Sequence, residues 1–146
     1  MRVLIFLLFI FGTFNLKSQI RIIQGKVIDE QLNSITAVII NLDSVLLGRT
    51  DSEGNFKIEV PLKTKSILFR YIGMERNSIR LDKDCNHLDV IMMQAANYDF
   101  MTMAEVDGER MKQFKHLLKL HKQAYKKGIF IAEKPCYKDI FIPRED

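Results

Sequence analysis

Apolar and polar residues alternate along much of the chain after residue 19. Phe56, Ile58 and Val60 alternate with Lys57 and Glu59. Such alternation places the apolar side chains on the buried face of a strand and the polar ones on its wet face. Alternating or continuous apolar runs of similar length recur between turn residues. We therefore predict seven strands, near residues 20–29, 37–42, 45–47, 56–60, 66–72, 78–81 and 87–92.

No helical period separates these runs, and turn residues stand between them at regular intervals. Short strands without intervening helices are typical of antiparallel sheets packed face to face, whereas parallel sheets need helical crossovers. No internal repeat is visible, which argues against a solenoid or a propeller. We predict a mainly β fold: a small, seven-stranded, antiparallel β-sandwich followed by a helix.

The clearest local signal is the polar turn that runs from Thr50 to Phe56. Asp51 is suited to accept hydrogen bonds from the backbone of the turn, and Gly54 can take a positive φ without a Cβ clash. Phe56 then restarts the alternating pattern, so we expect a hairpin here. Gly73 is a second structural turn position, because it breaks the apolar run of residues 66–72.

The helical period appears only near the end of the chain, over residues 109–127. Spacings of three and four separate the apolar positions Met111, Phe114, Leu118, His121 and Tyr125, and Leu117 and Ala124 widen the same face. An adjoining strip carries the basic residues Lys112, Lys115, Lys119, Lys122 and Lys126. We predict an amphipathic helix with a basic edge.

The helix has two candidate starts. Asp107, with Glu109 in the first turn, is one. The other is a capping box formed by Thr102 and Glu105. Gly128 follows the last turn and suits the C-terminal end.

Two roles for this helix remain open on sequence. Its apolar face packs on the sheets and leaves a solvated lysine row, or it meets an anionic membrane surface or a protein partner. In the second case the interaction residues are Lys112, Lys115, Lys119, Lys122, Phe114 and Leu118. The last apolar runs, residues 129–131 and 140–143, add an edge strand or dock in extended form.

Residues 1–18 have the features of a signal peptide. Arg2 precedes an apolar run from Val3 to Phe14, and Ser18 is a small residue at a cleavage position. An uncleaved membrane anchor and a buried helix are the alternatives, although the run is short for a membrane span. We expect an exported protein, periplasmic or associated with the outer membrane. Losing Arg2 and Lys17 lowers the formal net charge of +4 by two, which is too little to indicate a nucleic-acid partner.

Catalytic signals are weak, and we predict no enzyme, no metal, no cofactor and no small-molecule substrate. His87, His116 and His121 lack metal-ligand spacing, and no serine stands in a nucleophile motif. The two cysteines, Cys85 and Cys136, form a disulfide in an oxidising compartment or remain two free thiols.

An ordered series of motifs resembles the carboxypeptidase regulatory-like domain family. The series runs through residues 25–29, 37–40, 48–56 and 69–75, and the resemblance covers roughly residues 20–92. It implies a transthyretin-like β-sandwich of the kind found in exported proteins of Bacteroidetes-type bacteria. The domain would occupy residues 19–94, and residues 95–146 would form a helical extension.

This sequence departs from the family pattern at two places. Residues 32–36 replace a Pro-Leu-Pro-Gly turn, and Met74 replaces a tyrosine. Members often precede the plug and barrel of TonB-dependent outer-membrane receptors. The resemblance therefore implies a non-enzymatic accessory module that binds an envelope protein, and the alternative is a peripheral membrane-binding protein that uses helix 109–127.

Overall fold

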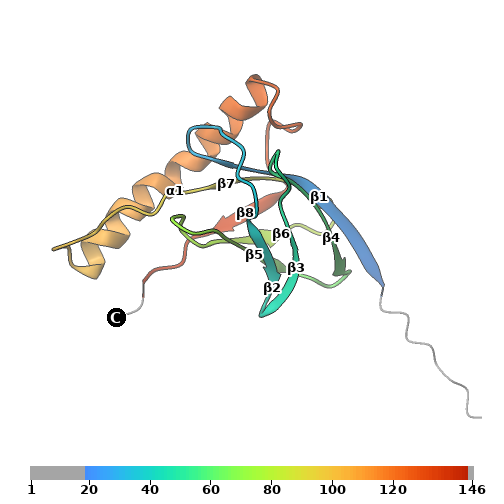
Figure 1. Ribbon diagram of the computed structural model, residues 1–146, viewed down its shortest axis with the longest axis horizontal. Coiled ribbons are helices and arrows are strands. Elements are labelled where there is room, and N and C mark those ends of the chain that lie inside the picture. The colour runs from blue at the N-terminus through green and yellow to red at the C-terminus, as the bar shows by residue number, and fades with distance from the viewer. Residues whose placement is uncertain (1–18, 145–146) are drawn as a thin grey trace, which may run out of the picture.

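The computed structural model describes residues 19–144, so the expected signal peptide at residues 1–18 lies outside the described part. The described chain is mainly β, with two sheets and one helix near the C-terminal end (Figure 1). Its elements are β1 (Ile20–Asp29), β2 (Ile39–Leu42), β3 (Val45–Arg49), β4 (Asn55–Pro61), β5 (Ser66–Arg70), β6 (Asn77–Leu81), β7 (His87–Met92), α1 (Met103–Lys126) and β8 (Tyr137–Ile140).

The strands divide into a three-stranded sheet, β4-β1-β7, and a five-stranded sheet, β3-β2-β5-β6-β8. Every neighbouring pair is antiparallel except β1 and β7, which run parallel, so the prediction of a wholly antiparallel fold is wrong at this pair. Gly25 explains how β7 fits beside β1: a Cβ there would lie 1.8 Å from the carbonyl oxygen of Leu88. The missing side chain allows the two backbones to approach.

The seven predicted strands are present, and an eighth comes from the C-terminal segment. β8 pairs with β6 and forms one edge of the five-stranded sheet. The apolar runs at residues 129–131 and 140–143 were expected to add an edge strand or to dock in extended form. An edge strand is present, but it lies mainly between the two runs. Its residues Tyr137 and Asp139 face inward while Lys138 and Ile140 are exposed. This alternation extends over only four residues, which is too short to be recognised in the sequence.

The turn at residues 50–54 is not a hairpin, because β3 and β4 belong to different sheets. Thr50 directs the crossing: its hydroxyl donates to the carbonyl of Ile35 at 2.7 Å and accepts from the N–H of Val38 at 2.9 Å. The N–H of Val27 donates to the carbonyl of Gly54 at 2.8 Å. This bond joins the end of the turn to β1, in the three-stranded sheet. These partners are distant in sequence, so the local turn signal could not reveal the crossing.

The main core lies between the two sheets and takes residues from both. Phe56 of β4 meets Phe69 of β5 edge to face, with ring centroids 5.6 Å apart. Aromatic pairs favour this geometry, and burial of such large side chains is a major stabilising contribution. Aliphatic side chains from β1, β2, β6 and β7 fill the remainder, including Ile23, Ile40, Ile79, Leu88 and Val90.

A second core cluster lies on the other face of the three-stranded sheet, beneath α1 (Figure 1). Ile28 of β1, Ile91 of β7 and Met93 just after β7 belong to it, and α1 contributes Leu117, Leu120 and Ala124. The helix therefore packs on the sheet with its apolar face. The predicted face is partly wrong, because Leu118 and Tyr125 are exposed while Val106, Arg110 and Leu120 are buried.

α1 begins earlier than the predicted range of 109–127. Thr102 is the N-cap and forms a capping box with Glu105, so the alternative start is confirmed. Asp107 lies inside the helix, where its carboxylate accepts a hydrogen bond from Arg110 at 2.6 Å. Gly128 follows the C-cap with φ +70°, a conformation that glycine adopts without strain.

Candidate functional site

A groove lies between α1 and the segment that leads into β8. It consists of two adjoining hollows of about 370 and 350 Å³, which share Leu118, Pro135 and Tyr137. We call it the α1–β8 groove. Its lining residues are Phe114, Lys115, Leu117, Leu118, Lys122, Glu133, Lys134, Pro135, Tyr137, Lys138 and Asp139.

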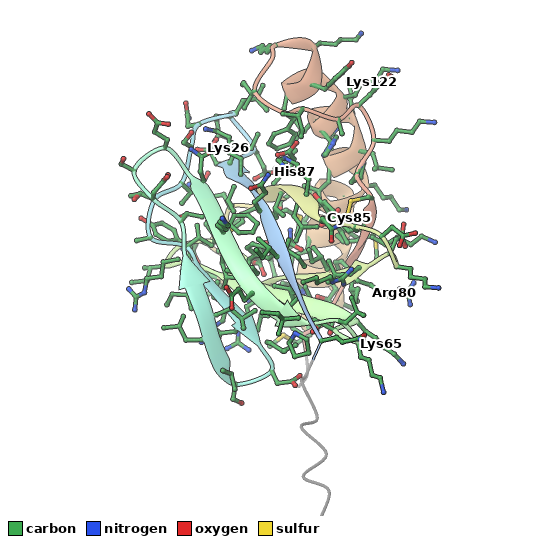
Figure 2. All side chains as sticks on the ribbon, turned by 90° about the vertical axis from the view of Figure 1, so that its right-hand side faces the viewer. Lys26, Lys65, Arg80, Cys85, His87 and Lys122 are labelled. Carbon is green, nitrogen blue, oxygen red and sulfur yellow. A yellow bond between two sulfur atoms is a disulfide. The ribbon has the colours of Figure 1, made fainter. Side chains whose placement is uncertain are left out.

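One wall of the groove is the face of α1 that turns away from the sheet. Leu118 is 66% exposed there, next to the half-buried Phe114. Lys115 and Lys122 stand on the same wall and are exposed, and Figure 2 shows Lys122 on the helix near the upper end of the molecule. An exposed leucine between lysines gives this wall an apolar centre and a basic border.

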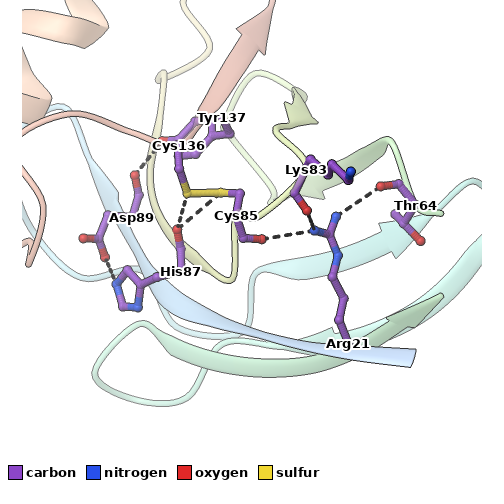
Figure 3. Close-up of a disulfide and its surroundings, with 8 residues drawn as sticks. All are labelled: Arg21, Thr64, Lys83, Cys85, His87, Asp89, Cys136 and Tyr137. Atoms are coloured by element: carbon purple, nitrogen blue, oxygen red, sulfur yellow. Dashed lines mark hydrogen bonds and ion pairs between the residues drawn. A yellow bond between two sulfur atoms is a disulfide. The ribbon is translucent and has the colours of Figure 1, made fainter. Parts of the chain in front are cut away.

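The opposite wall is fixed by covalent and polar links to β7. A disulfide joins Cys136, directly before β8, to Cys85, two residues before β7 (Figure 3). The buried hydroxyl of Tyr137 donates to the backbone carbonyl of Asp89. Burial raises the pKa of the Tyr137 phenol well above its ordinary value, so the phenol remains a donor at neutral pH. This wall is therefore held in place before any partner binds.

The loop between α1 and β8 is held by two further contacts. The Nε2 atom of His121 lies 3.1 Å from the carbonyl oxygen of Ala132, and the N–H of Ile131 donates to the Asp89 carboxylate at 3.0 Å. Burial lowers the pKa of His121, so this imidazole is neutral at pH 7. A neutral Nε2–H donates to the carbonyl and ties the helix to the loop.

The floor of the groove contains a carboxylate that has no ion-pair partner among residues 19–144. Asp139 accepts a hydrogen bond from Asn77 Nδ2 at 3.2 Å, and the same amide donates to the carbonyl of Ile91 at 2.9 Å. Burial raises the pKa of Asp139 to about 6. Lys122 and Glu133 form an exposed ion pair across one end of the groove, with a 3.1 Å separation.

β8 leaves one edge free, because β6 is its only strand neighbour in the described part of the chain. The N–H of Asp82 bonds the carbonyl of Cys136, and Leu81 is paired with Tyr137. In an antiparallel ladder this pattern makes Leu81 and Tyr137 a non-hydrogen-bonded pair. The backbone N–H and C=O groups of Tyr137 and Asp139 consequently point away from β6, along the free edge.

The structure brings together four of the six predicted interaction residues, namely Phe114, Lys115, Leu118 and Lys122, in the α1–β8 groove. Lys112 pairs with Glu109 at 2.6 Å and Lys119 is exposed, and neither lines the groove. Sequence reasoning missed Pro135, Tyr137 and Asp139. The only signal near them was Cys136, whose partner identifies which strand the segment must approach.

The other predicted positions serve the fold. The carboxylate of Asp51 accepts from the N–H groups of Glu53 and Asn55 at 2.9 and 2.8 Å, and Gly54 has φ +76°. Phe56 lies in the main core. Gly73 has φ +78° in the connection between β5 and β6.

Within residues 19–144 no three His, Cys, Asp or Glu side chains gather closely enough to hold a metal ion. Over the same range, no helix has both the length and the apolar character needed to cross a membrane. His87 and Asp89 form a pair at 2.8 Å, and His116 is exposed on α1.

The chain was compared with models of protein families and with curated proteins. Neither comparison found a match.

Proposed function

We propose that this protein is a non-enzymatic binding module that holds an extended segment of another protein in the α1–β8 groove. The observation that carries the proposal is the free edge of β8 beside an exposed apolar patch with a lysine border. A bound segment would add a sixth strand to the five-stranded sheet. Its apolar side chains would cover Leu118, and its acidic side chains would lie near the lysines.

The edge of β8 supports the first part of this proposal. An unpaired strand edge offers backbone donors and acceptors that an extended peptide can pair with. Tyr137 and Asp139 supply these groups, and the disulfide and the Tyr137 hydroxyl hold the strand in place. A fixed edge lowers the ordering cost of binding.

The chemistry of the groove supports the second part. Leu118, Pro135 and Tyr137 form its apolar centre, and Lys115, Lys122, Lys134 and Lys138 stand around it. Two carboxylates, Glu133 and Asp139, line the same groove, so lysines are in excess. Charge complementarity favours a partner with Asp or Glu next to apolar residues.

We further infer that the module belongs to the carboxypeptidase regulatory-like family and is an exported, transthyretin-like β-sandwich. The motifs of residues 25–56 and 69–75 support this inference, as does the single core shared by the two sheets. The disulfide suits an oxidising compartment such as the periplasm. The partner would then be a protein of the cell envelope.

The test is a selection of binding peptides. The protein from residue 19 to residue 146 is panned against displayed random dodecapeptides, and selected peptides are measured by calorimetry. We expect sequences that alternate apolar and acidic residues. Leu118→Asp should weaken their binding at least about tenfold, because it places a charge at the centre of the contact.

Val45→Asp is the matched control, because Val45 is 64% exposed on β3, the opposite edge of the same sheet. It should leave binding unchanged. Loss of binding in Val45→Asp with retention in Leu118→Asp would place the contact on β3 and contradict the proposal. Recovery of no binding peptide would contradict it as well.

A membrane surface is the alternative occupant of this side of α1. The exposed lysines support it, whereas the burial of Leu117, Leu120 and Ala124 against the sheet leaves α1 without a free apolar face. Flotation with anionic vesicles separates the two functions. If the wild type floats and a variant with Lys112, Lys115, Lys119 and Lys122 changed to Gln does not, the membrane function replaces the peptide-binding one.

A further inference from the structure

A separate cavity of about 640 Å³ lies near the beginning of α1, between the β5–β6 connection, the β7–α1 connection and the C-terminal segment after β8. Its volume is in the range of pockets that hold small molecules. Apolar and charged side chains share its lining. The lining residues are Leu68, Met74, Glu75, Arg76, Ala95, Met103, Arg110, Ile142, Pro143 and Arg144.

A network of buried charges forms one side of this cavity. The carboxylate of Glu75 is buried and accepts from Arg110 Nε at 3.0 Å and from Arg144 Nη2 at 3.1 Å. Arg110 Nη1 also bonds Asp107 at 2.6 Å. Both oxygens of Glu75 are thus engaged, and the carboxylate is neutralised by two guanidinium groups.

The arginines retain capacity for a further anion. Arg76 is exposed and forms no ion pair among residues 19–144. Arg144 is held over the ring of Tyr98, with 4.8 Å from its Cζ atom to the ring centroid. Three arginines line the cavity, against Glu75 in the lining and Asp107 beside it, so one positive charge remains in excess.

The remaining walls are apolar and flexible. Met74 and Met103 line the cavity together with Ile142. Methionine thioethers adapt to the shape of a ligand and make favourable contacts with aromatic rings. An apolar body with an anionic head would therefore satisfy both halves of the cavity.

We propose that this cavity binds a small carboxylate that carries an aromatic or alkyl group. The carboxylate would lie against the guanidinium groups of Arg76 and Arg144, which match its planar geometry. The aromatic or alkyl group would pack between Met74 and Met103. This binding is independent of the α1–β8 groove, which lies on other residues.

Three probes of the same shape test the proposal: 4-phenylbutyrate, 4-phenylbutanol and 4-phenylbutylamine. Binding to the protein is measured by chemical-shift titration of its backbone amides. We expect 4-phenylbutyrate to bind most tightly, with shifts at Met74, Arg76 and Met103. Equal affinity for the three probes, or no binding of 4-phenylbutyrate, would overturn the proposal.

Arg76→Gln is the informative variant, because Arg76 makes no ion pair in the described structure and its loss should leave the fold intact. It should weaken 4-phenylbutyrate binding roughly fivefold, which is the size of an exposed ion pair, and leave 4-phenylbutanol binding unchanged. Lys119→Gln removes the same charge elsewhere and should have no effect. Leu118→Asp should also have no effect, so failure of the groove and failure of this cavity are distinguishable. An unchanged affinity in Arg76→Gln would contradict the assigned role of this residue.

Discussion

The disulfide between Cys85 and Cys136 should account for a large part of the stability of this protein. It joins residues separated by 51 positions and ties β8 to the start of β7. In the chain-entropy model, a closed loop of this length lowers the entropy of the unfolded chain enough to stabilise the fold by about 4 kcal/mol. This is a large fraction of the free energy of unfolding of a typical domain, which is about 5–15 kcal/mol.

The perturbation is the double substitution Cys85→Ala and Cys136→Ala, measured by urea denaturation. We expect the free energy of unfolding to fall by about 4 kcal/mol relative to the oxidised wild type. Hydrogen exchange should show the largest loss of protection in β8, because the disulfide is the covalent anchor of that strand. Wild-type protein reduced with dithiothreitol is the control and should behave like the variant. A loss below about 1 kcal/mol would refute the reasoning.

Three further predictions concern the charge network, the groove floor and the β1–β7 contact. Arg110→Met should lower the free energy of unfolding, measured by urea denaturation, by about 3 kcal/mol, because it leaves Glu75 buried with one cation fewer. Adding Glu75→Met should recover part of that loss. A larger loss in the double variant would contradict this reasoning. The pKa of Asp139 is about 6 in the fold against 3.8 in the unfolded chain, so the folded state holds the extra proton and stability falls as pH rises from 4 to 6. Asp139→Asn should flatten that dependence and raise stability at pH 7 by roughly 3 kcal/mol at most, and an unchanged pH profile would contradict the assignment. Gly25→Ala should lower the free energy of unfolding by at least about 3 kcal/mol, because the new Cβ meets a backbone carbonyl of β7. Gly108→Ala, in open space on α1, should raise it by about 1 kcal/mol. Equal melting temperatures for the two variants would contradict the contact.

The local elements of this fold were predictable from sequence. Alternation marked β4, and the Thr102–Glu105 pair marked the start of α1. These signals are local because a strand face and a helix cap are determined by residues a few positions apart.

The pairing of those elements was not predictable. β7 pairs in parallel with β1, and the turn after β3 leads to the other sheet, because contacts such as Thr50 with Ile35 join distant segments. The same reason explains the error in the face of α1. The sequence predicts that Arg110 is a surface residue, yet it is buried. Glu75, 35 positions earlier, supplies its counter-charge.

Only the helix wall of the candidate site was predictable from sequence. Phe114 and Leu118 were identified from the helical period, but the opposite wall was not. Pro135 and Tyr137 have no periodic pattern, and their segment is held near α1 by contacts with residues distant in sequence, namely the Cys85–Cys136 disulfide, the β6–β8 pairing and the Tyr137–Asp89 hydrogen bond.

The central claim is that an extended segment pairs with the free edge of β8. Amide hydrogen exchange of the protein with and without a selected peptide tests it most directly. The claim predicts new protection at the N–H groups of Tyr137 and Asp139, which have no partner on β6. Unchanged exchange at both residues, with new protection in β3 (Val45–Arg49), would contradict it.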